Sequence, residues 1–544
     1  MKRPCFIFLY ILSLLSFALH DVNAGWSMPE EVIFPPSAPF NSTQSNIATG
    51  GNGNSVAIWY DVSDTETGIG ILRGAVLPAG SVNNLGQPAW ILTSQIAAGV
   101  QDPFDPVDQA LGMDAAGNAL VAWTDGNNNI FVSKLLAGQL TWTTPQIINV
   151  QLGSEIVQPP YVAVAPNGDA IVLWASSPYN YNYHLLSNTY DAQTNSWKGQ
   201  VELLGGGLIQ DSNINQVAID ANGNGVAVVS TPDNNVQAMA YHFASNSWTT
   251  IPPIITAPND LGVTVAVDHA GNATLVWIDS TTGNVNAATL PFNQTTFTNQ
   301  QQLSLSAAIE FPVVHTNAAG NALAIWSNDS GAISSARFSV STGIWTALPD
   351  LDLGGNIASD LDLSVDAQGN AVAVWTISLD SGRFIQAASL GVTDSAWNLL
   401  TTLSAVDQNR FAHVVLTSRG DGVAIWEDDI NDNSITGTID SSIFLGMFSE
   451  VPLPPTGFVG VVIKNKFLNR TDRIHHLVWD ASVDPTVVSY DLFRNGVLLS
   501  TFAAGSPSYV FEEHFRHKNR VDTYTLTSVN VSGVQSIPVI IMLK

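Results

Sequence analysis

Positively charged residues are scarce in this chain. Its 544 residues include 18 Lys and Arg against 45 Asp and Glu, which gives a net charge of −27 with neutral histidines. The excess of acid lies in residues 25–450, with 7 basic against 37 acidic residues, whereas residues 451–544 have 9 against 7. So acidic a segment repels phosphate groups, and we therefore expect neither nucleic acid nor anionic membranes as its partners. It favours solubility, or affinity for cations and basic surfaces.

Cysteine and long apolar runs are also nearly absent. Cys5, the one cysteine, precedes the one long apolar run, residues 6–19, which follows Lys2 and Arg3 and leads to small residues at 22–24. This run is shorter than the ~20 residues that a membrane-spanning helix needs, so residues 1–24 are predicted to be a cleaved signal peptide. We expect the mature protein to lack disulfides and transmembrane segments, and to be secreted, periplasmic or at the cell surface. A large exported chain without cysteine is typical of bacteria.

The motifs of common enzyme sites are missing as well. The sequence has no zinc-ligand spacing, no nucleophile elbow and no phosphate loop. The five arginines of residues 25–450 are scattered, and the S-x-D-x-G-x-T-W boxes of sialidases are absent. Hydrolysis of glycosides by two carboxylates stays open, because an acidic chain offers many candidates, but nothing in the sequence selects a pair.

What the chain has in abundance is one repeated stretch, of which 365–375 is a clear copy. Asp366 and Gly369 have turn chemistry, because aspartate caps a turn and glycine accepts the positive φ that a bulged hairpin turn needs. Apolar and polar residues alternate before the turn, and the segment after it is apolar on both faces. This pattern predicts a β-hairpin whose second strand is buried between two sheets.

Eight copies of this hairpin align on their turn glycine. Asn or Asp follows each glycine, and tryptophan stands six residues after it in seven of the eight copies. Successive glycines are 64, 51, 55, 48, 49, 49 and 51 residues apart, which is typical of propeller blades or another repeat array. The turn glycines are Gly53, Gly117, Gly168, Gly223, Gly271, Gly320, Gly369 and Gly420.

A second marker, a strand opened by Trp or Phe, lies between the copies. With it each repeat has about four strands, which is one propeller blade. The sequence therefore predicts an all-β fold in which residues 25–450 form an eight-bladed β-propeller. The strand that begins at Trp26 lacks a blade of its own, so we expect it to complete the last blade and close the ring. The alternative is that 443–448 provides that strand.

The composition changes at the prolines of 452–455, and residues 451–544 read as a small β-sandwich. A strand with Trp479 is followed by one with Tyr490, by an Asn495–Gly496 hairpin turn, and by a later strand with Tyr524. This part resembles a fibronectin type III domain, which implies a spacer or binding module rather than catalysis. The repeats resemble those of secreted bacterial proteins whose blades have a V-D-x-x-G-N-x-x-x-x-W hairpin, a resemblance that specifies the fold and leaves the function open.

In four-stranded blades, the turns between first and second strands lie on one face of the disc. Their repetition in every blade marks the Gly-Asn turns as structural. The opposite face differs from blade to blade, as a functional face does. Acids recur there two residues after the tryptophan and are candidate ligand-binding residues; they are Asp61, Asp125 and Asp279.

Two loops of that face have distinctive compositions. In 177–184, Tyr179, Tyr181 and Tyr183 alternate with asparagines, a composition that can stack on sugar rings or pack against a partner, although alternation in the adjoining strand would give the same pattern. The loop 427–433 is dense in hard oxygen ligands, so calcium is the candidate ion, without the glycine and distal glutamate of an EF-hand. Its candidate metal ligands are Asp428, Asp429 and Asp432.

The sequence thus favours an exported, non-catalytic protein that recognises a glycan or an extracellular protein through the variable loop face. The alternative is a glycosidase or polysaccharide lyase that acts in the central channel. A third interpretation is a structural surface protein that associates with itself. The ligand itself, the oligomeric state and any bound ions do not follow from the residues.

Overall fold

The computed structural model describes residues 25–543 with short gaps. The chain divides into two compact units, a larger one with Trp26–Pro452 and a smaller one with Leu453–Val531 and Pro538–Lys544. Among the described residues no helix is long and apolar enough to cross a membrane. The segments not described are 33–40, 65–68, 102–108, 126, 152–155, 178–182, 206–213, 232–234, 256–261, 280, 430–436, 446, 449–451, 453, 467–470, 483–486, 507, 516–520, 531–534 and 537.

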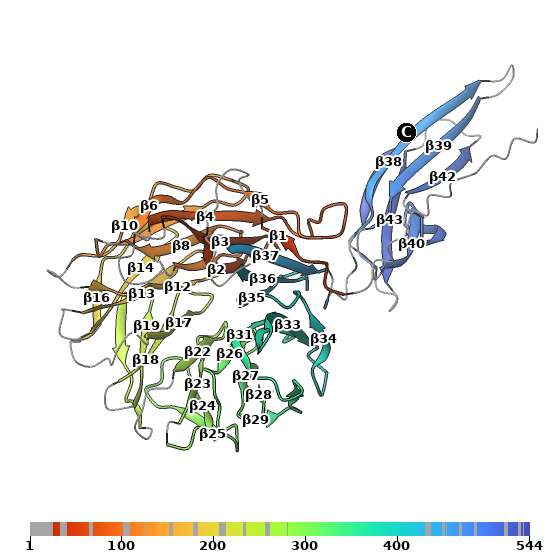
Figure 1. The fold of residues 1–544 in the computed structure, drawn as a ribbon. Helices are drawn as coiled ribbons and strands as arrows, with labels where there is room; N and C mark the ends of the chain where they lie inside the picture. Colours follow the sequence, from red (N-terminus) through yellow and green to blue (C-terminus); the bar gives the residue numbers. More distant parts are fainter. Residues whose placement is uncertain are drawn as a thin grey trace, which may run out of the picture. The chain divides into compact units, whose positions relative to one another are not determined.

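The described part of the larger unit consists of antiparallel sheets arranged as in a β-propeller, and the all-β prediction is confirmed. Eight sheets follow one another along the chain, and in each the first three strands run in sequence order from the centre outward (Figure 1). The first strands are β2 (Asn41–Thr49), β7 (Gln109–Met113), β12 (Tyr161–Val164), β17 (Ile214–Ile219), β22 (Val263–Val267), β26 (Val313–Thr316), β31 (Ala358–Val365) and β35 (Asn409–Leu416).

Each first strand continues through a tight turn into a second strand that contains the tryptophan position. The second strands are β3 (Ser55–Asp64), β8 (Ala119–Thr124), β13 (Ala170–Ser177), β18 (Gly225–Ser230), β23 (Ala273–Ile278), β27 (Ala322–Ser327), β32 (Ala371–Leu379) and β36 (Gly422–Asp429). The third strands are β4 (Ile69–Leu77), β9 (Ile130–Leu135), β14 (His184–Asp191), β19 (Asn235–His242), β24 (Val285–Leu290), β28 (Ala332–Ser339), β33 (Gly382–Leu390) and β37 (Gly437–Phe444).

Short fourth strands form the outer edge. They are β5 (Ile91–Leu92), β10 (Gln146–Ile147), β15 (Ser196–Trp197), β20 (Ser247–Thr250), β25 (Thr298–Gln302), β29 (Ile344–Ala347) and β34 (Asn398–Thr402). Further short strands pair with third strands, namely β6 (Ala97–Gln101), β16 (Val201–Leu204), β21 (Ile254–Ile255) and β30 (Leu351–Asp352), and β11 (Ile156–Val157) pairs with β13.

The last sheet takes its outer strand from the N-terminal end of the described chain. β1 (Glu30–Glu31) pairs antiparallel with β37, and backbone bonds from Ser27 and Val32 extend the pairing on either side. Neighbouring first strands contact each other around the circle, including β35 with β2. The expected completion of the last sheet by the N-terminal strand is therefore confirmed. Ile443 and Phe444 belong to the third strand β37 instead, so the alternative assignment of 443–448 is wrong.

The core lies between the sheets. Second strands are buried on both faces, as in β13 and β27, where every residue is buried. Each apolar cluster of the larger unit joins two neighbouring sheets; one contains Trp59 from β3 together with Ile425 from β36. Burying a tryptophan or leucine in such a cluster contributes roughly 1.5–3 kcal/mol each, so the second strands dominate the stability of the ring.

The recurring turn has the predicted structural role. The carboxylate of Asp366 accepts hydrogen bonds from the backbone N of Asn370 (2.9 Å) and from its Nδ2 (2.8 Å). The oxygen of the same amide, Asn370 Oδ1, accepts the N–H of Val392 in the outer hairpin (2.9 Å). One asparagine thus fastens the inner turn of a sheet to its outer hairpin. The same link occurs at Asn54, Asn118, Asn224, Asn272 and Asn321.

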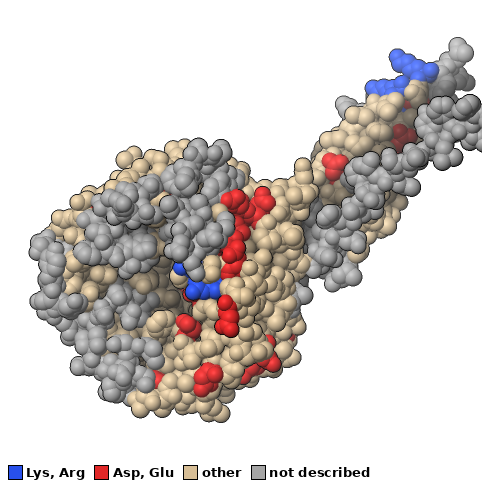
Figure 2. Space-filling view, viewed as in Figure 1, with Lys and Arg blue, Asp and Glu red and all other residues tan. Residues whose placement is uncertain are grey.

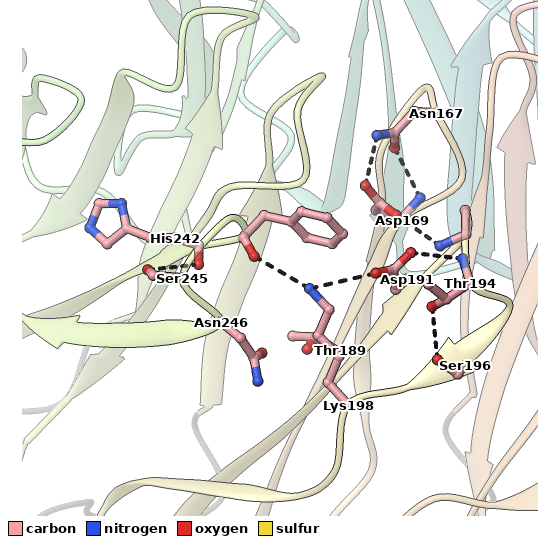
Figure 3. A network of polar contacts seen from close by, with 12 residues as sticks. Asn167, Asp169, Thr189, Asp191, Thr194, Ser196, Lys198, His242, Ser245 and Asn246 are labelled. Atoms are coloured by element: carbon pink, nitrogen blue, oxygen red, sulfur yellow. Dashed lines mark hydrogen bonds and ion pairs between the residues drawn. The ribbon is translucent and has the colours of Figure 1, made fainter.

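Figure 3 shows the version of this link in which aspartate replaces asparagine. Asp169 Oδ1 accepts the N–H of Ala192 (2.8 Å), and Asn167 Nδ2 donates to the other oxygen (2.7 Å). On the outer hairpin, Lys198 Nζ lies 3.4 Å from the ring centroid of Phe243 and donates to its carbonyl oxygen (3.3 Å). Since Phe243 belongs to the next sheet, this cation–π contact joins two sheets at their rim.

Turn glycines also pack against the sheet that precedes them. A Cβ built at Gly320, where φ is +87°, would lie 2.6 Å from Oδ2 of Asp268, the turn cap of the sheet before. Gly271 has the same relation to Asp220, at 3.0 Å. The glycine is therefore required both by its positive φ and by the close approach of two sheets.

The smaller unit is a sandwich of two antiparallel sheets. One sheet has the order β38 (Thr456–Lys466), β39 (Thr471–Asp480), β42 (Ser508–Phe515). The other has the order β41 (Val497–Ala503), β40 (Val487–Arg494), β43 (Asp522–Asn530), β44 (Val539–Leu543). Trp479, Tyr490 and Tyr524, which the sequence singled out, lie in its core. His475 is also buried there, and its Nδ1 lies 2.9 Å from Tyr524 Oη.

The link between inner turn and outer hairpin gives a stability prediction. Replacing Asn370 with alanine removes both hydrogen bonds of its side chain and leaves the Val392 N–H without its acceptor. We expect the free energy of unfolding of the larger unit to fall by about 1–2 kcal/mol. Gln368→Ala, in the same turn but exposed, is the control and should change it by less than about 0.5 kcal/mol. Scanning calorimetry measures both; equal effects would contradict the structural role of Asn370.

Candidate functional site

Three neighbouring first strands, β31, β35 and β2, contain a bulge at the same level, where two residues oppose the tryptophan of the second strand. The first bulged residue has positive φ in each: Asp360 (51°), Phe411 (49°) and Gln44 (54°). Residues other than glycine rarely adopt this backbone conformation. It costs on the order of 1–3 kcal/mol, and it persists only where the surrounding structure stabilises it. Three such residues on adjacent strands mark this part of the ring as a candidate site, which we call the bulge cluster.

Side chains from neighbouring sheets satisfy the backbone groups that the bulges release. The buried carboxylate of Glu427 accepts hydrogen bonds from the backbone N of Gln44 and of Ser45, the latter at 3.3 Å. Asp360 Oδ2 accepts the N–H of Phe411 (3.4 Å), and Gln109 Nε2 donates to the carbonyl of Gln44. The bulges are thus held by contacts across three sheet boundaries, from β31 to β7.

A histidine–carboxylate pair lies beside the bulge of β35. His413 Nδ1 is 3.5 Å from Asp362 Oδ2, which also accepts the N–H of Val414 (2.9 Å). Burial disfavours charge on both side chains, but their hydrogen bond and opposite charges outweigh it, so the pKa of Asp362 is lowered and that of His413 is raised. Glu427 and Asp360 add to the rise of the His413 pKa. Burial lowers the pKa of His315 on β26, which therefore favours the neutral form.

Phe411 is the aromatic side chain of the bulge cluster. It is 44% exposed, although its neighbours Ala412 and Asn409 are buried. The guanidinium carbon of Arg410 lies 5.2 Å from the centroid of the Phe411 ring, and Arg410 Nε lies 3.6 Å from Glu427 Oε2. An exposed aromatic ring is thus placed next to a carboxylate acceptor, Asp360, and a cationic donor.

A second carboxyl interacts with Asp360. Burial and the charge of Asp360 both raise the pKa of Glu310, which stands shortly before β26 in the neighbouring sheet. In the described part of the chain, neither carboxylate has a basic side chain within ion-pair distance. A glycoside hydrolase uses two carboxyl groups with different pKa values, one protonated as the general acid and one ionised.

The opposite end of the first strands borders a cavity. Its volume is about 250 Å³, and it is lined by the inner turns of five successive sheets, from Pro166 to Ala367. Aliphatic residues such as Ile219, Val267 and Val365 form much of its wall. This cavity lies on the face of the repeated turns, whereas the sequence predicted ligand binding on the opposite face.

The acids that follow the tryptophans are engaged in local structure. Asp61 is 2% exposed, pairs with Arg73 and accepts a hydrogen bond from Ser42 Oγ (2.6 Å). Asp125 accepts the backbone N–H groups of Asn127 (3.0 Å) and Asn129 (2.9 Å). Asp279 similarly accepts the N–H groups of residues 281 and 282, both at 3.0 Å. The structure places them on three separate sheets and gives each a capping or pairing role; their contact with a ligand stays a prediction.

The predicted calcium loop falls largely outside the described residues. Asp432 and the side chain of Asp429 are among the parts not described, and Asp428 is half-buried on β36. Within the described residues, no group of three or more His, Cys, Asp or Glu is arranged to hold a metal. Figure 2 shows Asp and Glu side chains in a band over β1, β37 and β36. Burial, followed by the charges of Asp428 and Glu31, raises the pKa of Asp440 in this region to about 7.

The tyrosine loop is described only at its end. Tyr179 and Tyr181 lie outside the described residues. Tyr183 is 7% exposed and belongs to an apolar cluster with Leu185 and Met239. The structure thus gives Tyr183 a place in the core between two sheets, and ligand contacts by this loop stay a prediction.

Sequence reasoning did not find the bulge cluster. Phe411, Asp360 and Gln44 share no motif, because a bulge is defined by the register of two strands and not by residue type. Arg410 was noted only as one of several scattered arginines. The structure shows these bulges in longer first strands, with 9, 8 and 8 residues in β2, β31 and β35 against 4 to 6 in the other first strands.

Comparisons with known proteins found distant structural similarities. No protein-family model and no curated protein matches the chain. A fucose-binding lectin from Aleuria aurantia, described as a six-bladed β-propeller, has a TM-score of 0.35 at 13% identity and covers 57% of this chain and 96% of its own. A Dyadobacter fermentans protein of unknown function has a TM-score of 0.39 at 12% identity, with 76% and 98% covered.

A Hadza microbial sialidase has a TM-score of 0.36 at 14% identity and covers 68% of this chain and 75% of its own. Likenesses this weak say nothing about ligand or activity. The β-propeller arrangement of the larger unit therefore rests on its own sheets, on their order and on the contacts of their first strands.

The pair of His413 and Asp362 gives a pH prediction. The pKa of His413 in the folded protein is raised above 6.5. Its contribution to stability is therefore complete below pH 6.5 and disappears as the pH rises through the folded pKa. With a pKa lowered below 3.8, Asp362 contributes above that pH and loses the effect as pH falls. The pair is therefore strongest between these limits.

We expect His413→Gln to destabilise the larger unit more at pH ~5.5 than at pH ~8.5, because a larger fraction of the histidine rings is charged at the lower value. Chemical unfolding of wild type and variant at both values measures the difference. Asp352→Asn, an exposed change on another sheet, is the control. An equal loss of stability at both values would show that the histidine is not charged by its partner.

Proposed function

We propose that this chain is an exported, non-catalytic glycan-binding protein. In this proposal each of the eight sheets of the larger unit is one blade of a propeller, and the smaller unit is a fibronectin type III-like module. The ligand binds on the face of the variable loops, at the bulge cluster. A bacterial origin and a secreted, periplasmic or surface location agree with the predicted signal peptide and with the lack of cysteine in the mature chain.

The observation that supports this proposal best is the exposed ring of Phe411 on a strained backbone between Asp360 and Arg410. An apolar ring exposed at a polar bulge costs free energy unless a ligand covers it. The strain is held by hydrogen bonds from neighbouring sheets, so the ring is presented in one fixed orientation. Fixed side chains lose little entropy on binding, which favours recognition.

The chemistry of the bulge cluster suits a sugar. The apolar face of a pyranose ring packs on an aromatic face, and its hydroxyl groups need acceptors and donors around the rim. Asp360 accepts hydrogen bonds from hydroxyl groups and Arg410 donates them, both with the added strength of a charge. A protein ligand would need a larger exposed apolar area than one ring supplies.

The proposal predicts a loss of glycan binding in Phe411→Ala. Truncation of a central aromatic contact weakens binding by about tenfold or more. A glycan array with the exported chain identifies the ligand, and titration calorimetry then compares variants. Phe292→Ala is the matched control, since Phe292 is 36% exposed but lies on the outer hairpin of another sheet. Unchanged affinity in Phe411→Ala would contradict the assignment to the bulge cluster.

Tyr181→Ala distinguishes the two candidate binding regions of the loop face, namely the bulge cluster and the loop 177–184. If the loop 177–184 takes part in binding, as its composition suggests, this variant also loses affinity. If only Phe411→Ala does, the site is confined to the bulge cluster. Tyr183→Ala is unsuitable as a test, because its buried ring would be lost from the core.

The alternative is a glycosidase that acts at the same place. The observation in its favour is the pair of Glu310 and Asp360, where burial and the neighbouring charge raise the Glu310 pKa as a general acid requires. Glycan that is released as new reducing ends by wild type, but not by Glu310→Gln, would favour catalysis. Binding without any product, with equal affinity in wild type and Glu310→Gln, would favour the non-catalytic function.

A further inference from the structure

The smaller unit has unpaired positive charges at one end. Lys464 of β38 is the direct cross-strand partner of Arg473 of β39, so two like charges face each other across the sheet. Such pairs are destabilising when nothing compensates them. No acidic side chain of the described residues lies within ion-pair distance of Lys464, Lys466 or Arg473.

This clustering is unusual in so acidic a chain. Residues 451–544 hold 9 of the 18 Lys and Arg, and the described strands bring Lys464, Lys466 and Arg473 to this end. Lys466 pairs with Thr471 where β38 meets β39, and Arg473 pairs with Phe515 where β42 ends. In Figure 2, Lys and Arg gather at the same end.

Apolar side chains are exposed at the same end. Val497 and Leu498, 66% and 50% exposed, follow the Asn495–Gly496 turn, and Val521 is 51% exposed just before β43. Asn495 Nδ2 donates to Asp522 Oδ1 (2.7 Å), which fixes the turn against the start of β43. Asp522 is thus occupied and buried, and Glu513 is paired with Arg494. Asp522 and Glu513 are therefore engaged elsewhere than with the lysines.

Basic side chains beside exposed aliphatic ones are the combination that binds a membrane interface. Lys and Arg are attracted to anionic headgroups, and the aliphatic groups gain by entering the boundary with the acyl chains. A soluble polyanion would use the charges but leave Val497, Leu498 and Val521 in water. The acidity that argued against a membrane partner belongs to residues 25–450, whereas residues 451–544 have 9 basic against 7 acidic residues.

We propose that this end of the smaller unit, with Lys464, Lys466, Arg473, Val497, Leu498 and Val521, binds the surface of a membrane that contains anionic phospholipid. The lysines and Arg473 contact headgroup phosphates, and the aliphatic side chains enter the interface. This proposal is independent of glycan binding by the larger unit. It would hold the chain at a membrane surface without a transmembrane segment.

Co-sedimentation of the exported chain with vesicles tests the proposal. We expect binding to vesicles of phosphatidylcholine mixed with phosphatidylglycerol, little binding to phosphatidylcholine alone, and loss of binding at high salt. The triple variant Lys464→Gln, Lys466→Gln, Arg473→Gln should bind on the order of a hundredfold less, since each cation near such a surface is worth about fivefold. Val497→Ser with Leu498→Ser should also weaken binding.

Val459→Ser with Val510→Ser is the matched control for the aliphatic variant. These valines are 54% and 58% exposed and pair through Val478, away from the basic end. Equal binding by wild type and triple variant, or equal binding to both kinds of vesicle, would overturn the proposal. Binding of soluble polyphosphate without any binding to vesicles would also overturn it and would assign the charges to a soluble polyanion.

Discussion

The ring of sheets depends on the close approach between the turn glycine of one sheet and the turn cap of the sheet before it. A Cβ at Gly320 would lie 2.6 Å from Asp268 Oδ2, and one at Gly271 would lie 3.0 Å from Asp220 Oδ2, so the sheets approach each other closely at the inner turn. The same carboxylates hold their own turns through the following asparagines. One residue type therefore shapes the hairpin and positions its neighbour. With this spacing the first strands meet around the centre, and the tryptophans fill the space between sheets.

The closing sheet departs from this pattern at its inner turn, on the face opposite the candidate site. There Thr417 replaces the capping aspartate, and Arg419 instead packs against Gly53 and Gly80 of the next sheet. On the other face, Glu427 of the same sheet holds the bulge of β2. A closed ring of equivalent sheets can be built with one contact that is repeated in every sheet. Where a sheet differs from its neighbours, we therefore expect selection for ligand recognition. The bulge cluster joins three such deviations on adjacent strands.

The sequence predicted the repeated part of this structure well, because that part depends on interactions between residues that are close in sequence. Turn residues such as Asp366 and Gly369, and the buried strand that ends at Trp375, act within one hairpin and recur at a readable period. The pairing of β1 with β37 was also foreseeable, since Trp26 opens a strand without a sheet of its own. What the sequence could not give is the register of β35 against β36, on which the positive φ of Phe411 depends.

Candidate acids were harder to judge from sequence for a related reason. Asp125 and Asp279 are turn caps, and Asp61 is half of an ion pair, yet the same residue types would serve a ligand equally well. The decisive difference is which neighbouring group donates a hydrogen bond to their carboxylate oxygens. That group is sometimes distant in sequence. Asp360 shows the reverse case, since it belongs to no recurring pattern, yet its carboxylate accepts the N–H of Phe411 and its charge raises the pKa of Glu310, both on other sheets.

Hydrogen exchange in Gly320→Ala tests the central claim most directly. If contact between glycine and the preceding cap sets the spacing of the sheets, the added Cβ must displace Asp268. The amide of Asn272, which donates to Asp268 Oδ1 (2.9 Å) in the preceding sheet, should then lose protection together with the amides of the mutated turn. Loss of protection confined to the turn at Gly320, with Asn272 as protected as in the wild type, would contradict this account.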